Sequence, residues 1–245
     1  MMKLNRNLFC TNCFILIAMS CYAQKKTQDK FVAILDKWYD GGVTLSDTSL
    51  TGLIRYNYLE GKVVYKSEEK STDFETLRAN DVVEFHFFDD IKDQQRVFKV
   101  IPFDVRQNQN LVPLFFEVLQ ELDHFALLSL LSDLESSRRV EHTRYSGPRQ
   151  VRYLQQLETL YIFDDKGSIL PLMTVNTREK IGYRSIKVKE RMINSGLIRL
   201  YTGDTFHQLE DYAKKNSLSF KKKEGLLAIL DFYDKLEKEK AEKMK

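Results

Sequence analysis

The stretch DVVEFHFF at residues 81–88 indicates the fold class, because apolar and polar side chains alternate along it. In an extended strand Val83, Phe85 and Phe87 share one face, and the polar residues between them share the other. The acidic pair 89–90 then begins a turn. This pattern predicts a half-buried strand of an antiparallel sheet.

Short strand-like segments extend this pattern in both directions along the chain. They are 43–45, 50–58, 62–65, 96–103, 161–163 and 169–172. The last two flank Gly167, a residue that adopts the positive φ of a tight hairpin without strain. The polar segment 136–148 is expected to be a loop or an irregular edge. Together these segments predict a meander of short antiparallel strands.

Residues 111–134 are apolar and leucine-rich, and two interpretations stay open from their periodicity alone. Phe115, Leu119 and Leu122 fit a helical period. The same residues also fit two strands, 114–120 and 125–131, joined by a turn at 123–124.

The C-terminal part changes character after residue 175. Residues 176–195 are charged and weakly patterned. A helix is expected from residue 204 or 205 to about 215, with Thr205 and Gln208 spaced as a capping box. A last helix is expected from about 222 to 240, where Leu226, Leu230 and Tyr233 lie on one apolar stripe. The charged tail after residue 236 is expected to fray.

The predicted architecture is therefore α+β. An antiparallel β-rich body, whose form as a meander, barrel or sandwich is left open, precedes two or three C-terminal helices. The expected divisions are a signal peptide at 1–23, the β-rich body at 24–175, and a helical region packed on it at 176–245.

Residues 1–23 have the order of features of a cleaved secretory signal peptide. Lys3 and Arg6 precede an apolar run at 14–19, and Ala23 ends the segment with a small residue. The run is shorter than the roughly 20 residues of a bilayer-spanning helix. The chain is thus expected to be exported to the periplasm or the exterior. The alternative is a lipoprotein cut before Cys21 and anchored through lipid on that cysteine.

Cleavage after residue 23 would remove all 3 cysteines, since Cys10, Cys13 and Cys21 lie within the segment. The mature chain would then lack disulfides, thiolate metal sites and a cysteine nucleophile. The 38 basic residues would also lose Lys3 and Arg6 and nearly match the 35 acidic ones. This balance argues against a nucleic-acid partner.

Several motifs are similar to those of an uncharacterised family of exported β-rich proteins of Bacteroidota that has no assigned activity. The matching segments are WYDGGV at 38–43, LTGLI at 50–54, DVVEF at 81–85, FFD at 87–89, FFEVL at 115–119, YTGD at 201–204, LSFK at 218–221 and ILDFY at 229–233. The resemblance implies a turn at 123–124 and therefore two strands within 111–134. It implies no catalytic residues, and residues 94–96 do not align with the family.

The candidate chemical groups are few and scattered. Glu84 and His86 share a strand face, as an acid–base pair would, but polar residues are normal on the solvent side of a sheet. His207 and Asp211 lie one turn apart on the predicted helix, where exposed pairs are common. The acid pairs 89–90 and 164–165 lack the ligand spacing of a calcium loop. No catalytic, cofactor-binding or metal-binding residue is assigned.

The basic stretch 138–153 contains five arginines interleaved with two tyrosines. We interpret it as a solvated edge strand, although it could also contact lipopolysaccharide phosphates or acidic glycans. The leading hypothesis is a non-catalytic, periplasmic or envelope-associated binding or structural protein whose partner is an envelope protein or glycan. The alternatives are a secreted hydrolase whose carboxylates converge only in the fold, and an envelope assembly factor with a protein partner. No cofactor is expected.

Overall fold

A computed structural model describes residues 37–58, 60–90, 93–105, 110–141, 149–180 and 185–243, with 132–141, 149–152 and 185 described by backbone alone. The expected signal peptide and its cysteines lie outside these residues. Eleven strands form one sheet. They are β1 (Tyr39–Thr44), β2 (Ser49–Asn57), β3 (Lys62–Lys66), β4 (Glu75–Arg78), β5 (Glu84–Asp89), β6 (Gln94–Phe103), β7 (Val112–Glu121), β8 (Phe125–Glu141), β9 (Arg149–Asp164), β10 (Ile169–Lys180) and β11 (Ser185–Met192).

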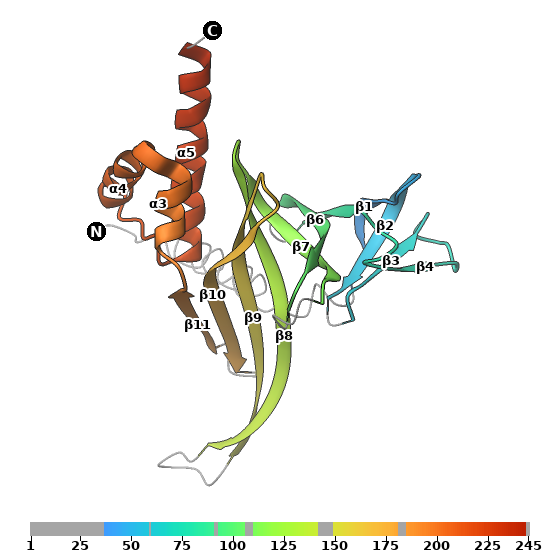
Figure 1. Ribbon diagram of the computed structural model, residues 1–245. Helices are drawn as coiled ribbons and strands as arrows, with labels where there is room; N and C mark the ends of the chain where they lie inside the picture. Colours follow the sequence, from blue (N-terminus) through green and yellow to red (C-terminus); the bar gives the residue numbers. More distant parts are fainter. Residues whose placement is uncertain are drawn as a thin grey trace, which may run out of the picture.

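The sheet is antiparallel throughout, and its order is β11-β10-β9-β8-β7-β6-β5-β1-β2-β3-β4. In the described part of the chain its two ends, β4 and β11, are not paired with each other, so the sheet is open. Figure 1 shows that β8 and β9 form a long hairpin that extends past their neighbours. The prediction of an antiparallel β-rich body is confirmed. Its form is an open sheet in which β1–β4 and β5–β11 are each a meander, joined where β5 pairs with β1.

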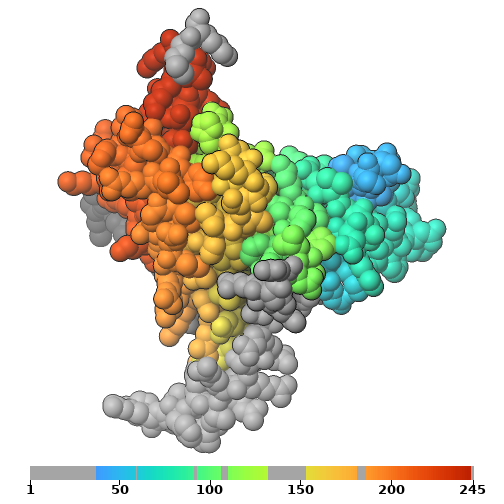
Figure 2. All heavy atoms as spheres, viewed as in Figure 1, coloured from blue at the N-terminus to red at the C-terminus, as the bar shows by residue number. Residues whose placement is uncertain are grey.

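Four helical elements follow the sheet. They are α3 (Gly196–Thr202), the 3₁₀ helix η1 (Gly203–Thr205), α4 (Phe206–Lys215) and α5 (Lys223–Lys243). Figures 1 and 2 show the helices on one side of the molecule and strands β1–β4 on the other. The expected C-terminal helices are confirmed, and α5 continues to Lys243 where a frayed tail was expected.

The helices pack on one face of the sheet and bury a large apolar cluster there. The apolar stripe of α5 lies against strand residues such as Leu160 and Met173, which are fully buried. On the same face, β1–β6 enclose a second cluster rich in aromatic rings, including Phe85 and Phe98, whose ring centroids lie 4.6 Å apart. Burial of these side chains supplies most of the favourable free energy of folding.

The ambiguous segment 111–134 forms two strands. β7 and β8 are joined through the turn at 122–124, as the two-strand interpretation required. The helical alternative fails because the segment alternates across the sheet: Phe115 belongs to the aromatic cluster of β1–β6, whereas Phe116 faces the opposite side.

Three sequence predictions are wrong in detail. Residues 136–141, expected in a loop, belong to β8, where backbone pairing with β9 overrides their polar character. Val83 is 52% exposed, and Val82 is buried in its place. The N–H of Val83 donates to the carbonyl oxygen of Thr44, which is also the register partner of Glu84, so the entry to β5 contains an extra residue.

The third error concerns Thr205, which was expected to cap α4. Its side chain makes no capping hydrogen bond. Instead its hydroxyl donates a hydrogen bond to Glu237 and accepts one from Lys240 of α5.

The sheet also continues to Met192 through β10 and β11, and the helices begin only at Gly196.

Candidate binding site

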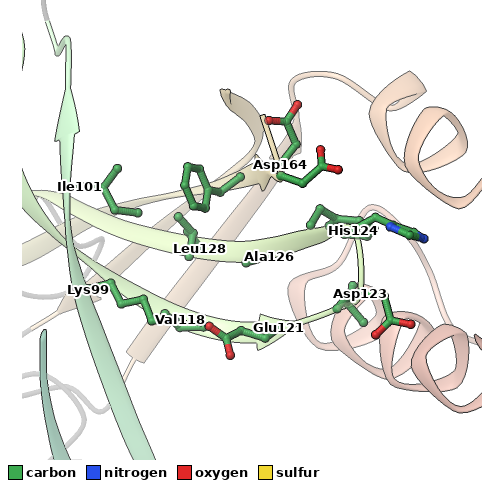
Figure 3. Close-up of a pocket in the computed structure, with 13 residues that line it drawn as sticks. Lys99, Ile101, Val118, Glu121, Asp123, His124, Ala126, Leu128 and Asp164 are labelled. Atoms are coloured by element: carbon green, nitrogen blue, oxygen red, sulfur yellow. Dashed lines mark hydrogen bonds and ion pairs between the residues drawn. The ribbon is translucent and has the colours of Figure 1, made fainter. Parts of the chain in front are cut away.

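A cavity of about 270 Å³ lies at one end of the sheet, beside the β7–β8 turn and the β9–β10 turn. Its lining residues Ile101, Val118 and Leu128 lie on the face opposite the helices, whereas Leu122 and Phe125 belong to the cluster under the helices. Figure 3 shows Asp123, His124 and Asp164 near the strand ends, with Ile101 and Leu128 further along the strands. The cavity therefore combines a polar rim with an apolar floor.

The floor belongs to an apolar cluster on this face, which we call the open-face cluster. Its members are Ile101, Phe103, Leu114, Phe116, Val118, Ala126, Leu128, Leu130, Tyr161, Phe163 and Ile169. Phe103, Phe116 and Tyr161 meet edge to face, with centroid separations of 5.3–5.6 Å. All members come from strands β6–β10, and no described helix contributes to the cluster. Phe116, Leu128 and Tyr161 are buried and the other members are half-buried. An apolar sheet face normally packs against another layer, so the half-buried members beside the cavity suit contact with a partner.

The rim of the cavity is acidic. Four carboxylates line it, on Glu121, Asp123, Asp164 and Asp165, against the single ammonium group of Lys99. Lys99 forms an ion pair with Glu121 across the mouth. The remaining excess of negative charge favours a ligand group that carries positive charge.

Asp164 also has a structural role, because it holds the β9–β10 turn and contacts α3. Its Oδ1 accepts hydrogen bonds from the backbone N–H groups of Ser168 at 2.7 Å and Lys166 at 3.1 Å, which close the β9–β10 hairpin. Its Oδ2 accepts a hydrogen bond from the Tyr201 hydroxyl of α3 at 2.8 Å. The Ser168 and Tyr201 hydrogen bonds hold the pKa of the Asp164 carboxyl below its ordinary value. The hairpin prediction is confirmed, with Gly167 at φ +81°.

A glycosidase-like hydrolase requires a carboxylic acid that stays protonated near neutral pH. Desolvation raises the pKa of the Glu179 carboxyl. Glu179 lies on β10 and does not line the cavity. Glu179 therefore gives the hydrolase alternative no support at this cavity.

Sequence reasoning missed a buried cluster of charges on the other face of the sheet. Arg96, Asp89 and Glu117 come from β6, β5 and β7, and each is less than 10% exposed. The Nε and Nη2 atoms of Arg96 donate to the two carboxylate oxygens of Glu117 at 2.6 and 2.7 Å. Arg96 Nη1 lies 3.6 Å from Asp89 Oδ2 and has no hydrogen-bond partner among the described residues.

Aromatic rings surround this buried charge cluster. The guanidinium carbon of Arg96 lies 5.5 Å from the Phe87 ring centroid and 5.2 Å from that of Phe98. Burial alone would lower the pKa of Arg96, but the charges of Glu117 and Asp89 and the hydrogen bonds that Arg96 donates to Glu117 raise it overall. The cluster stays ionised and joins three strands from within the core. Alternation along β5 and β7 could have placed these residues inward, but only the register between strands brings them together.

A second polar group connects the sheet to α5. Glu158 of β9 accepts hydrogen bonds at 2.5 Å from the Ser129 hydroxyl and from the Lys223 ammonium group. The backbone N–H of Lys223 also donates to Glu190 of β11 at 2.8 Å. These bonds fix the start of α5 against three strands.

The residues singled out in the sequence do not converge on one site. Glu84 and His86 are both half-buried on β5. His207 lies beside Glu210, with 3.3 Å between Nδ1 and Oε2, rather than pairing with Asp211. Asp90 forms an ion pair with Lys37 at 2.5 Å on the surface, away from its buried neighbour in the chain.

The basic stretch lies along the far part of the β8–β9 hairpin, where the register pairs Arg138 with Arg152. Residues 142–148 lie outside the described part of the chain. Within that part, no group of three or more His, Cys, Asp or Glu residues could hold a metal ion. None of its helices has the length and apolar character of a membrane span.

Comparison of the chain with protein-family models, curated proteins and solved structures finds no match. The resemblance to exported proteins of Bacteroidota therefore stays a prediction.

Proposed function

We propose that this protein is a non-catalytic, envelope-associated binding protein whose cavity receives an apolar side chain of a protein partner. The observation that carries the proposal is the open-face cluster, an apolar face built from strands alone and hollowed at its edge. The expected signal peptide supports placement in the envelope, as a soluble protein or as one anchored through Cys21.

The size and charge of the cavity define the partner. Small-molecule pockets usually enclose roughly 300–1,000 Å³, and this cavity of about 270 Å³ lies below that range. It suits one or two anchoring side chains of a polypeptide. Because the rim is acidic, the segment that binds should carry Lys or Arg beside its apolar anchor.

The test compares two synthetic peptides with the same central Leu-Phe pair, one flanked by lysines and the other by glutamates. We expect the lysine peptide to shift the methyl resonances of Ile101, Val118 and Leu128 in NMR spectra, and its affinity to fall with added salt. The glutamate peptide should bind at least about tenfold more weakly, because four carboxylates line the rim.

A matched pair of variants locates the interaction. Ala126→Trp fills the cavity and should abolish binding of the lysine peptide. Ala241→Trp places the same side chain on the exposed end of α5 and should leave binding unchanged. Equal binding of both peptides, or binding that survives Ala126→Trp, would overturn the proposal.

A further inference from the structure

Strand β11 forms one edge of the sheet (Figure 1) and is paired on one side only, with β10, among the described strands. Alternate residues of a strand point to the same face. Lys187, Lys189 and Arg191 are exposed and therefore share one face of β11, and we call these three residues the basic edge. Val188, which is 54% exposed, lies on the other face.

The hydrogen bonds to β10 show which backbone groups of β11 point outward. The N–H of Ile193, directly after β11, donates at 2.8 Å to the carbonyl oxygen of Leu172, the residue opposite it in the register of the two strands. In an antiparallel pair, residues that exchange hydrogen bonds alternate with residues whose N–H and C=O groups point away. The groups that point away from β10 therefore belong to Ile186, Val188 and Glu190.

A strand added at this edge would meet a different surface on each face of the sheet. On one face it would lie beside the basic edge. On the other it would lie beside Val188 and the half-buried Ile186. Glu190 on that face is already neutralised, because it lies 3.0 Å from the Lys222 ammonium group and accepts the backbone N–H of Lys223. The edge therefore suits a strand with acidic residues on one face and apolar residues on the other.

The neighbouring strand does not neutralise the basic edge. The β10 residues on the same face are Thr174, Asn176 and Arg178, none of which carries a negative charge. The acids in the same register rows, Asp133 and Glu135 of β8, lie three strands away, at about 14 Å. The acidic side chains of an added strand would instead lie directly beside the three cations, where opposite charges attract.

Charges on an edge strand also block unwanted strand pairing, so this simpler role needs comparison. The other edge, β4, is only 4 residues long and carries charges of both signs. In contrast, β11 has 8 residues and pairs with β10 without a bulge or a proline. Charge of one sign repels a second β11, whose cations would lie on the same face of an antiparallel pair. The same charge attracts an acidic strand, so it selects a partner rather than closing the edge.

We propose that β11 binds an extended segment of a partner protein by strand addition, and that this segment alternates acidic and apolar residues. The outward backbone groups supply the main-chain hydrogen bonds, and the basic edge supplies the specificity. This surface lies apart from the cavity and selects the opposite charge. The inference is therefore independent of the proposed binding of a lysine- or arginine-bearing segment at the cavity.

The experiment adds the capped peptide Ser-Glu-Val-Glu-Val-Glu-Ser to the mature chain, expressed from residue 24, and follows amide hydrogen exchange by NMR. At a peptide concentration of about ten times Kd, exchange at Ile186, Val188 and Glu190 should slow about tenfold, because only the unbound fraction exchanges. The N–H groups of Lys187 and Lys189 already bond to β10 and should change little. Equal slowing at all five residues, or no slowing at any, would overturn the proposal.

Two further peptides test the charge pattern. Ser-Lys-Val-Lys-Val-Lys-Ser should bind at least about tenfold more weakly, and the variant Lys187→Glu, Lys189→Glu, Arg191→Glu should reverse this preference. Ser-Glu-Glu-Glu-Val-Val-Ser has the same composition as the first peptide without its alternation and should also bind more weakly. Equal affinity of the alternating and the block peptide would show that net charge alone is responsible, which contradicts strand addition.

A matched pair of variants tests the backbone contact. Val188→Pro removes an outward N–H and sets a ring in the path of the added strand, at an edge position where proline is tolerated. It should abolish binding, whereas Val188→Thr keeps the N–H and a β-branched side chain and should bind as the parent does. Binding that survives Val188→Pro would refute strand addition. Thermal unfolding shows whether each variant is folded, and the charge-reversal variant tests the edge without proline.

A cavity variant separates this edge from the proposed function. Ala126→Trp, which fills the cavity, should bind the alternating acidic peptide as the parent does. Loss of that binding in Ala126→Trp would assign the acidic peptide to the cavity and overturn the inference. Failure of the lysine-flanked Leu-Phe peptide at the cavity would leave the result at β11 unchanged.

Discussion

Replacing Arg96 tests whether the buried charge cluster contributes to stability by neutralisation. Arg96→Met keeps much of the volume of the side chain but leaves the carboxylates of Asp89 and Glu117 buried without their counter-ion. Removing one partner of a buried ion pair costs about 3–5 kcal/mol. Because whole domains are stable by only about 5–15 kcal/mol, the variant should be close to unfolding.

A neutral version of the cluster supplies the matched control. The triple variant Asp89→Asn, Arg96→Met, Glu117→Leu removes all three charges and keeps an acceptor oxygen at 89 for the further contacts of that side chain. Buried ion pairs replaced by neutral residues of similar volume are often neutral or stabilising in proteins. We therefore expect the triple variant to be at least as stable as the parent protein to within about 1 kcal/mol.

Urea unfolding, followed by circular dichroism and by the fluorescence of Trp38, measures both free energies of unfolding. The expected order is triple variant equal to or above the parent, with Arg96→Met far below. A loss under about 1 kcal/mol for Arg96→Met would refute the reasoning. A triple variant as unstable as Arg96→Met would show that the charged cluster makes the fold more stable than neutral side chains at these three positions do.

Three further changes test other parts of the structure. Gly41→Ala places a Cβ 2.1 Å from the His86 carbonyl oxygen of β5, so a backbone shift is required and we expect a loss of about 1–3 kcal/mol or more in urea unfolding. Tyr201→Phe removes one of the hydrogen bonds to Asp164, so the pKa of that carboxyl, followed by NMR, should move up toward its ordinary value. A carboxyl whose pKa is lowered in the folded protein stabilises the fold above the pKa of the unfolded chain, and this stabilisation is lost as the pH falls through the folded pKa. The variant should therefore lose stability at a higher pH than the parent protein during acid unfolding. Lys223→Met removes the counter-ion of a mostly buried carboxylate on β9 and should cost about 1–3 kcal/mol, with unchanged stability contradicting its role in fixing α5.

Local sequence patterns were sufficient to predict the strands and the main helices. Alternation identified β5, turn chemistry identified the β9–β10 hairpin, and a 3.6-residue period identified α5. These features are local because they depend on neighbouring backbone geometry and on which side of an element is apolar. Segments 136–141, 176–180 and 185–192 were missed as strands because pairing with a long neighbour overrides weak local patterning.

Only the tertiary structure decided which side chains meet. Arg96 finds Glu117 because β6 and β7 pair in one register, and a shift of one residue would turn both away from the core. The cavity joins two turns that lie about 40 residues apart in the chain, and only the strand order makes β4 and β11 the edges of the sheet. Register and edge position arise from long-range pairing, so they leave no local signal in the sequence.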